Sequence, residues 1–157
     1  MEKNRERLKL QLPPLALALG AALLMWLPVR WLDADTTFSA FWSLLIMLLW
    51  VSGLALIAVA VLTLYLGGTT LDSRFPEKTD RLITQGVYGY SRNPVCLGLL
   101  LLLSGWGLYL DSFYALPGLL LFFGLVTWLQ VLPEEGALRA RFGDSYRDYC
   151  RRVRRWL

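Results

Sequence analysis

The chain has 157 residues, of which 56% are hydrophobic and 18% are charged, and its mean hydropathy is +0.47. This composition lies outside the range of ordinary water-soluble globular domains and is typical of a membrane protein. The formal net charge of +4 does not indicate a nucleic-acid-binding protein, because the basic residues fall where membrane topology would place them.

Uncharged stretches divide the chain into four candidate membrane spans. No charged residue occurs in the ranges 10–29, 36–71, 93–110 and 112–133. These gaps predict spans over residues 12–29, 38–66, 95–110 and 113–132. The first stretch exceeds the apolar part of a signal peptide, about 7 to 15 residues, and no small-residue cleavage site follows it. We therefore expect it to remain attached and to span.

The spans differ in length and in their connections. The second is about 43 Å long as a helix, against a hydrocarbon core of about 30 Å, so it must tilt or protrude. Only Asp111-Ser112 connects the third span to the fourth, which predicts a helical hairpin. Gly53 in the second span and the glycines of the hairpin permit close backbone packing.

The distribution of basic residues predicts the topology. If the N-terminus is cytoplasmic, 15 of the 16 Lys and Arg residues lie on the cytoplasmic side and only Arg30 lies outside. The positive-inside rule therefore predicts that both termini are cytoplasmic. The basic tail would also suit an anionic inner leaflet, at about 1 kcal/mol per basic residue near the surface.

Residues 80–94 form the stretch where the apolar chain becomes polar. Gly86 and Gly89 let the backbone pass close to a bound molecule, and Pro94 suits the first turn of a helix. The start of that helix, with Arg92 and Asn93, can hold an anionic group through amide and guanidinium protons. The alternative is an ordinary interfacial loop in which Arg92 extends to the lipid headgroups and Asn93 caps the helix.

The tail after the fourth span predicts two helices that Gly143 separates. The apolar residues of the second helix recur at helical spacing, namely Tyr146, Tyr149, Cys150, Val153, Trp156 and Leu157. We interpret this segment as an interfacial amphipathic helix, which acts either as a membrane anchor or as a lid. The paired Glu134 and Glu135 are either solvated charges or, if Glu134 turns inward, partners of the 80–94 turn.

The chain from about residue 65 to residue 157 carries an ordered set of motifs. They are Gly67-Gly68-Thr69-Thr70, Pro76-Glu77, Leu82-Ile83-Thr84-Gln85-Gly86-Val87-Tyr88, Ser91-Arg92-Asn93-Pro94, Gly98, Glu134-Glu135, Leu138, Phe142-Gly143, Tyr146, Tyr149 and Val153-Arg154-Arg155-Trp156. In this order they resemble the isoprenylcysteine carboxyl methyltransferase and phospholipid methyltransferase superfamily. The first two spans show no resemblance beyond hydropathy.

With this resemblance, the predicted architecture is a single all-α integral-membrane domain over residues 1–157. It has four transmembrane helices, the last two a helical hairpin, and a C-terminal cytoplasmic amphipathic helical segment. Residues 1–66 hold the first two spans, and residues 67–157 hold the cofactor-binding turn, the hairpin and the tail.

The resemblance implies a membrane enzyme that transfers a methyl group from S-adenosyl-L-methionine to a lipophilic acceptor entering from the bilayer. By motif position the cofactor contacts are Asp80, Arg81, Leu82, Ile83, Tyr88, Asn93, Pro94, Val95, Cys96 and Glu134. The catalytic candidates are Arg92 and Glu134, and Gln130 is the substrate-binding candidate. We expect membrane lipids and a lipophilic substrate as partners, and neither a metal nor nucleic acid.

Three positions depart from the family pattern. The family motif usually reads Arg-His-Pro-x-Tyr, whereas here Asn93 and Cys96 replace the His and the Tyr. Gln130 stands where the prenylcysteine enzymes place an Arg near the substrate carboxylate, which disfavours a prenylcysteine substrate. The chain contains no His, so no imidazole can act as general base. An acceptor that arrives as an anion or as a soft nucleophile needs none.

Two other classes of protein remain as alternatives. A non-catalytic membrane scaffold or lipid-binding protein would explain the spans and the basic tail, but not the polar turn or the paired glutamates. A transporter would be expected to have an acidic, basic or His side chain inside a span, and no predicted span contains one. We expect no disulfide between Cys96 and Cys150, because both are predicted to be cytoplasmic, and we interpret Cys96 as a packing residue.

Overall fold

The computed structural model describes residues 13–31, 40–68 and 81–157, and in these ranges it is helical, with one isolated β-bridge. The elements in chain order are α2 (Pro14–Trp31), α3 (Ala40–Leu66), the short 3₁₀ helix η2 (Gly86–Gly89), α4 (Pro94–Tyr109), α5 (Ala115–Val126), the π-helical turn η3 (Thr127–Val131) and α6 (Leu132–Arg152). The all-helical prediction is confirmed for the described residues. Asp80, a predicted cofactor contact, lies outside them.

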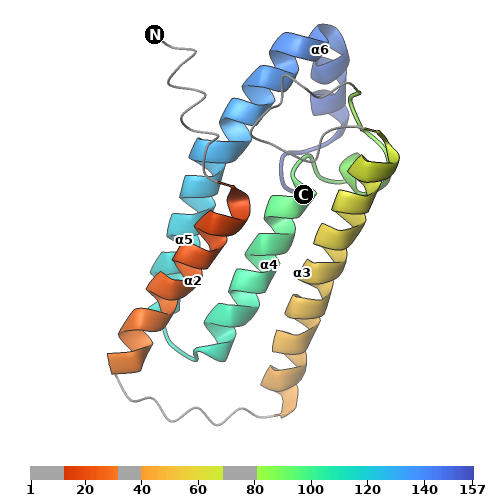
Figure 1. Cartoon of the computed structure of the whole chain (residues 1–157). Helices are drawn as coiled ribbons and strands as arrows, with labels where there is room; N and C mark the ends of the chain where they lie inside the picture. The colour runs from red at the N-terminus through yellow and green to blue at the C-terminus, as the bar shows by residue number, and fades with distance from the viewer. Residues whose placement is uncertain (1–12, 32–39, 69–80) are drawn as a thin grey trace, which may run out of the picture.

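Helices α2 to α5 lie side by side as a bundle, and α6 continues α5 beyond the end of that bundle (Figure 1). Each predicted span corresponds to a helix, and the boundaries of the first three agree to within two residues. Two described helices, Ala40–Leu66 and the continuous Ala115–Arg152, are long and apolar enough to cross a membrane, whereas α2 and α4 are apolar but shorter. The count of four spans therefore stays a prediction.

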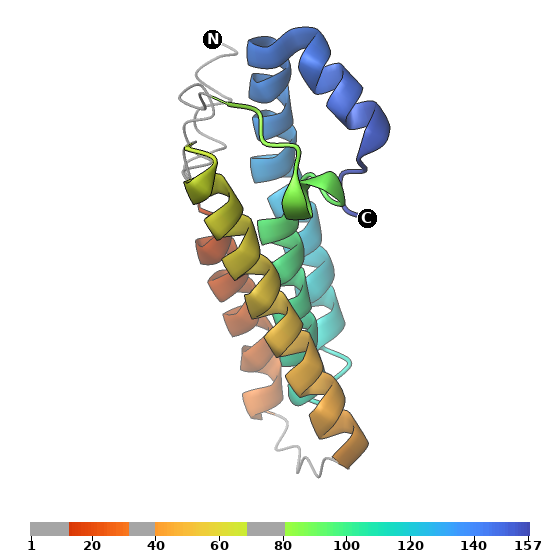
Figure 2. The ribbon, with the colours of Figure 1, turned by 90° about the vertical axis from the view of Figure 1, so that its right-hand side faces the viewer.

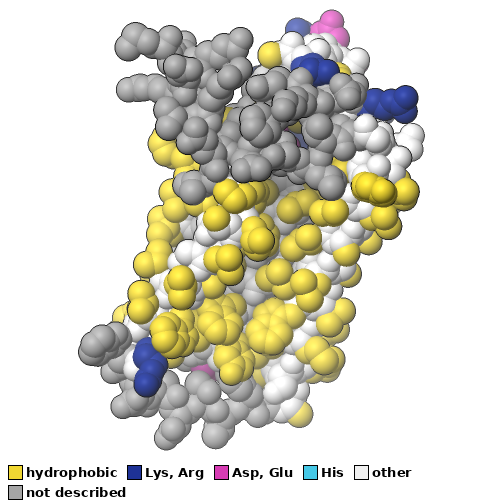
Figure 3. Space-filling model, viewed as in Figure 1, with side chains coloured by type: hydrophobic (Ala, Val, Ile, Leu, Met, Phe, Trp, Pro, Cys, Tyr) yellow, Lys and Arg dark blue, Asp and Glu magenta, His cyan; other side chains and the backbone are white. Residues whose placement is uncertain are grey.

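The outer surface of the bundle is apolar. Leu19 on α2 and Leu54 on α3 are 60% and 59% exposed, and only 17% of the most apolar stretch of α3 is buried inside the protein. Figure 3 shows hydrophobic side chains over the middle of one face, with Lys and Arg towards its ends. A continuous exposed apolar surface of this kind is suited to contact with lipid rather than water.

Helices α3 and α4 approach each other closely at two glycines. A Cβ atom built on Gly53 would lie 2.8 Å from the carbonyl oxygen of Gly98, and one built on Gly98 would lie 2.8 Å from that of Gly53. The predicted close packing at Gly53 is thus confirmed, with Gly98 as its counterpart. By contrast, Gly124 on α5 has open space where a side chain would stand.

Replacing Gly98 by Val is expected to destabilise the bundle by about 1–3 kcal/mol, because the new side chain can be accommodated only if α3 moves away from α4. Thermal unfolding of the purified protein in detergent measures the change. Gly124→Val is the matched control, since it introduces the same side chain into an apolar helix without a clash. Equal unfolding midpoints for the two variants would contradict the close approach.

The interior of the bundle is filled by side chains from α2, α4 and α5. Met25 is fully buried, and it lies against the positions of Gly107 and Gly118, where a side chain would clash with it. The indole Nε1 of Trp106 donates a hydrogen bond to the main-chain oxygen of Ala22 at 3.1 Å. These contacts attach α2 to the hairpin of α4 and α5.

Helix α6 reverses direction at Gly143, whose φ of 52° and ψ of −119° interrupt the helix, as the sequence predicts. A positive φ costs a glycine little. The part of α6 after this kink turns back towards η2 and the start of α4 (Figure 2). There Tyr146, Tyr149 and Val153 form a buried cluster with side chains that include Leu82 and Phe142.

The fold-back corrects the interpretation of the tail as an interfacial helix. Of its apolar residues, Tyr146, Tyr149 and Val153 are at most 7% exposed, because they pack on the protein's own polar turn rather than on a membrane surface, whereas Leu157 is 74% exposed. The Tyr149 hydroxyl also donates a hydrogen bond to the main-chain oxygen of Tyr88 at 2.7 Å. Trp156 packs against Phe123 of α5, with ring centroids 5.1 Å apart.

Candidate functional site

Three segments meet at the end of the bundle where α4 begins: the 82–93 turn, the first turn of α6 and the C-terminal residues 153–156. The main-chain N–H of Arg92 donates to the oxygen of Arg154 at 3.1 Å, and Ser91 and Arg154 form the isolated parallel bridge. The oxygen of Arg155 accepts bonds from Asn93 Nδ2 at 3.2 Å and from Ser91 Oγ at 3.4 Å. The C-terminus is therefore held against the turn that starts α4.

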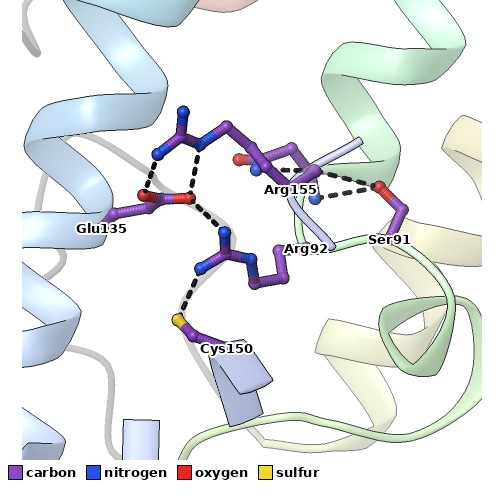
Figure 4. A network of polar contacts seen from close by, with 6 residues as sticks. Ser91, Arg92, Glu135, Cys150 and Arg155 are labelled. Atoms are coloured by element: carbon purple, nitrogen blue, oxygen red, sulfur yellow. Dashed lines mark hydrogen bonds and ion pairs between the residues drawn. The ribbon is translucent and has the colours of Figure 1, made fainter. Parts of the chain in front are cut away.

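A partly buried ionic group, which we call the arginine–glutamate cluster, consists of Arg92, Glu135 and Arg155, of which Glu135 is the most buried (Figure 4). Arg155 donates from Nε and Nη2 to the two carboxylate oxygens of Glu135, at 2.9 and 2.8 Å. Arg92 Nη2 lies 3.3 Å from Glu135 Oε1. This bidentate bond to Glu135 raises the pKa of Arg155, so its guanidinium stays charged at neutral pH.

Arg92 is buried and oriented by the protein. Its side chain is 11% exposed, its Nη1 contacts the sulfur of Cys150, and its Nε is buried with no hydrogen-bond partner among the described residues. The alternative of an interfacial loop with an exposed Arg92 is therefore wrong. The expectation that Asn93 caps the helix in that alternative is also wrong, because the Asn93 side chain makes no capping bond and donates to the main-chain oxygen of Arg155 instead.

Tyr88 and Glu134 lie close together beside this cluster. Burial raises the pKa of Tyr88, and the negative charge of Glu134 raises it further. The phenol therefore stays protonated at neutral pH and serves as a neutral hydrogen-bonding group. Gly86, at the start of the same short helix, has a φ of 61°, a conformation that favours glycine.

Gln130 is the buried polar residue without a described partner. It lies in η3, is 0% exposed, and neither its Nε2 nor its Oε1 has a hydrogen-bond partner among the described residues. A buried amide left in this state costs about 1–3 kcal/mol, so native proteins rarely leave one without a partner. Gln130 precedes Glu134 by about one helical turn, which puts both on the same side of the helix.

The other predicted contacts are spread along the turn and the start of α4. Arg81 is exposed, and Leu82 packs into the cluster around Tyr146 and Tyr149. Of the first residues of α4, Pro94 and Cys96 are buried and Val95 is half-buried. Cys96 packs in the bundle core, and both cysteines are free thiols, as predicted.

Sequence reasoning missed the roles of Glu135, Arg155 and Ser91. It gave the first of the paired glutamates the inward position, whereas Glu135 is only 6% exposed and holds both arginines. The available signal was the motif Val153-Arg154-Arg155-Trp156, but nothing local indicates which arginine turns inward.

A sequence model of the phospholipid methyltransferase family matches residues 41–145, which run from α3 through the polar turn to the kink of α6. The chain belongs to the phospholipid methyltransferase family. The resemblance seen in the motifs is thereby confirmed. The C-terminal residues that complete the arginine–glutamate cluster lie beyond the matched range.

Two curated relatives resemble this phospholipid methyltransferase family member. An uncharacterised protein of Haemophilus influenzae is 43% identical over 61 residues, which are 39% of this chain and 97% of that protein. The protein-S-isoprenylcysteine O-methyltransferase of Schizosaccharomyces pombe is 34% identical over 81 residues, which are 49% of this chain but only 33% of that enzyme. No solved structure matches the chain.

Family membership and the apolar helices together indicate a membrane methyltransferase. The groups described above fit a polar ligand at the end of the bundle. The amide of Gln130 offers a buried donor and acceptor, Glu134 offers a carboxylate, and Tyr88 offers a neutral hydroxyl.

Proposed function

We propose that this protein transfers a methyl group from S-adenosyl-L-methionine to a lipophilic acceptor that enters from the bilayer. The observation that carries the proposal is the group of Tyr88, Gln130 and Glu134 at the end of an apolar bundle, inside the range matched by the family. A non-catalytic scaffold gives no reason for a buried amide that has no partner among the described residues and lies one helical turn before a carboxylate.

The residues at this end of the bundle are chemically suited to the polar groups of this cofactor. Glu134 would pair with its ammonium group, and Asn93 with the start of α4 would face its carboxylate. Tyr88 would hydrogen-bond to or pack on the nucleoside as a neutral phenol. Arg81, Leu82, Ile83, Pro94, Val95 and Cys96 would complete the contacts.

The bound cofactor would supply an electrophilic methyl group on a sulfonium. The protein's own part would be to align the acceptor with that methyl group and to exclude water. Tyr88 is not available as a base, because its raised pKa keeps the phenol protonated at neutral pH. The acceptor would therefore arrive as an anion or as a soft nucleophile. The candidates are a lipid amine, a lipid-linked carboxylate and a small hydrophobic thiol.

Gln130 would contact the acceptor, and Arg92 would contribute positive charge beside the reacting groups. Because Gln130 is neutral, it would offer hydrogen bonds to the acceptor without supplying a cation for a carboxylate. Arg92 is engaged with Glu135 and Cys150, so it would act mainly through its charge and its buried Nε.

Binding of S-adenosylhomocysteine to the detergent-purified protein tests this function. Titration calorimetry should show saturable binding, and lipid extracts incubated with the protein and labelled S-adenosylmethionine should gain label. Absence of both would reject the methyltransferase and favour the scaffold or lipid-binding protein.

We further propose a multi-pass arrangement of four spans with both termini in the cytoplasm. It is supported by the 15 of 16 basic residues that this topology places on one side. A reporter that is active only in the cytoplasm should be active when it is fused after Leu157. Activity of a reporter that works only on the outer side would reject this topology.

A further inference from the structure

We propose that Glu135 and Arg155 are positioning residues that hold Arg92 and Asn93 in the arrangement that binds the cofactor, so that the C-terminal segment 153–157 is part of the binding site. This inference rests on the proposed function. The motifs include both side chains, but the resemblance implies no role for either, and Arg155 lies beyond the range matched by the family.

Arg155 contacts the two halves of the site at once. Its guanidinium makes a bidentate bond to Glu135 at the start of α6 (Figure 4). Its main-chain oxygen accepts the bond from Asn93 at the start of α4. Residues 93 and 135 are thus joined through one C-terminal residue. Any ligand that bridges the start of α4 and the start of α6 would depend on this connection.

The arginine–glutamate cluster also fixes the direction of Arg92. Arg155 occupies both carboxylate oxygens of Glu135, so Arg92 has only a shared contact with Oε1, at 3.3 Å. Its Nη1 meets Cys150, and its Nε is left as a buried donor. Two guanidiniums and one carboxylate leave one net positive charge next to the N-terminus of α4, an arrangement that favours an anionic group such as a carboxylate.

The tail has apolar attachments that do not involve the Arg155 side chain. Val153 is buried in the cluster with Tyr146 and Tyr149, and Trp156 packs on Phe123. Loss of the guanidinium should therefore leave the tail in place while releasing Glu135 and Arg92 to re-pair. This separation makes the role of Arg155 testable by substitution.

The test compares Arg155→Gln with Arg151→Gln in the full-length protein, using calorimetric titration with S-adenosylhomocysteine well below the unfolding temperature. Arg151 is the matched control, because it also lies near the C-terminus but its side chain is 80% exposed. Arg155→Gln should weaken binding by about 10 to 100-fold, and Arg151→Gln should bind like wild type. Turnover at saturating cofactor should change much less than KM, as expected for a residue that acts on binding.

Arg155→Lys provides the second measurement. It keeps the charge but loses the bidentate geometry, so its affinity should lie between those of wild type and Arg155→Gln. It also decides the question if Arg155→Gln does not fold. Wild-type affinity in whichever of these variants folds would overturn the positioning role while leaving the proposed function intact. Absence of binding by the wild type would reject the proposed function and this inference together.

Discussion

Glu135→Gln is expected to lower the free energy of unfolding by about 3–5 kcal/mol, because it removes the carboxylate that faces two arginines in a buried site. Arg92 would be left with its charge buried and only Cys150 as a described side-chain partner. Thermal or denaturant unfolding in detergent measures the loss. From the sequence alone, Glu134 rather than Glu135 is the carboxylate expected to turn inward, and no structural role is expected for Glu135.

Asp144→Asn is the control for this prediction, since it also removes one carboxylate from α6. The Asp144 side chain is 87% exposed, and its ion pair with Arg147 at 3.1 Å is solvated, so its loss should hardly change the unfolding transition. Equal stability of the Glu135 and Asp144 variants would mean that the arginine–glutamate cluster does not stabilise the fold.

Glu134→Gln is expected to weaken cofactor binding rather than to destabilise the fold. Removing one charge-assisted contact to the cofactor's ammonium group costs roughly 1.5–3 kcal/mol, or about 10 to 150-fold in affinity. The fold should persist, because Glu134 is only half-buried and the cluster at Glu135 is untouched. Calorimetry with S-adenosylhomocysteine gives the affinity, and the unfolding midpoint provides the control.

The ionisation of Tyr88 gives this experiment an internal check. Burial is the largest cause of its raised pKa and the charge of Glu134 the second. In Glu134→Gln the pKa of Tyr88 should fall but stay above its ordinary value, so the phenol remains protonated at neutral pH. A change in affinity therefore reports the lost carboxylate rather than a newly charged tyrosine. An unchanged dissociation constant would remove Glu134 from the cofactor site.

The uncharged gaps of the sequence determine where the helices lie. Three of the four predicted spans agree with α2, α3 and α4 to within two residues, and the predicted break at Gly143 is the kink of α6. These features can be predicted from neighbouring residues alone, because an uncharged apolar run indicates a span and a glycine favours the positive φ of a break. The order of the motifs likewise determines the family.

The pairing of charges depends on the tertiary structure. Glu135 and its neighbour Glu134 are chemically identical in the sequence, and the tail offers several arginines. The choice is made by the kink at Gly143, which sends the chain back so that Arg155 meets Glu135, 20 residues away, and Asn93, 62 residues away. The same reversal explains why the apolar face of the tail is covered by the polar turn rather than by lipid. Helical periodicity defines an apolar face, but only the path of the chain decides what covers it.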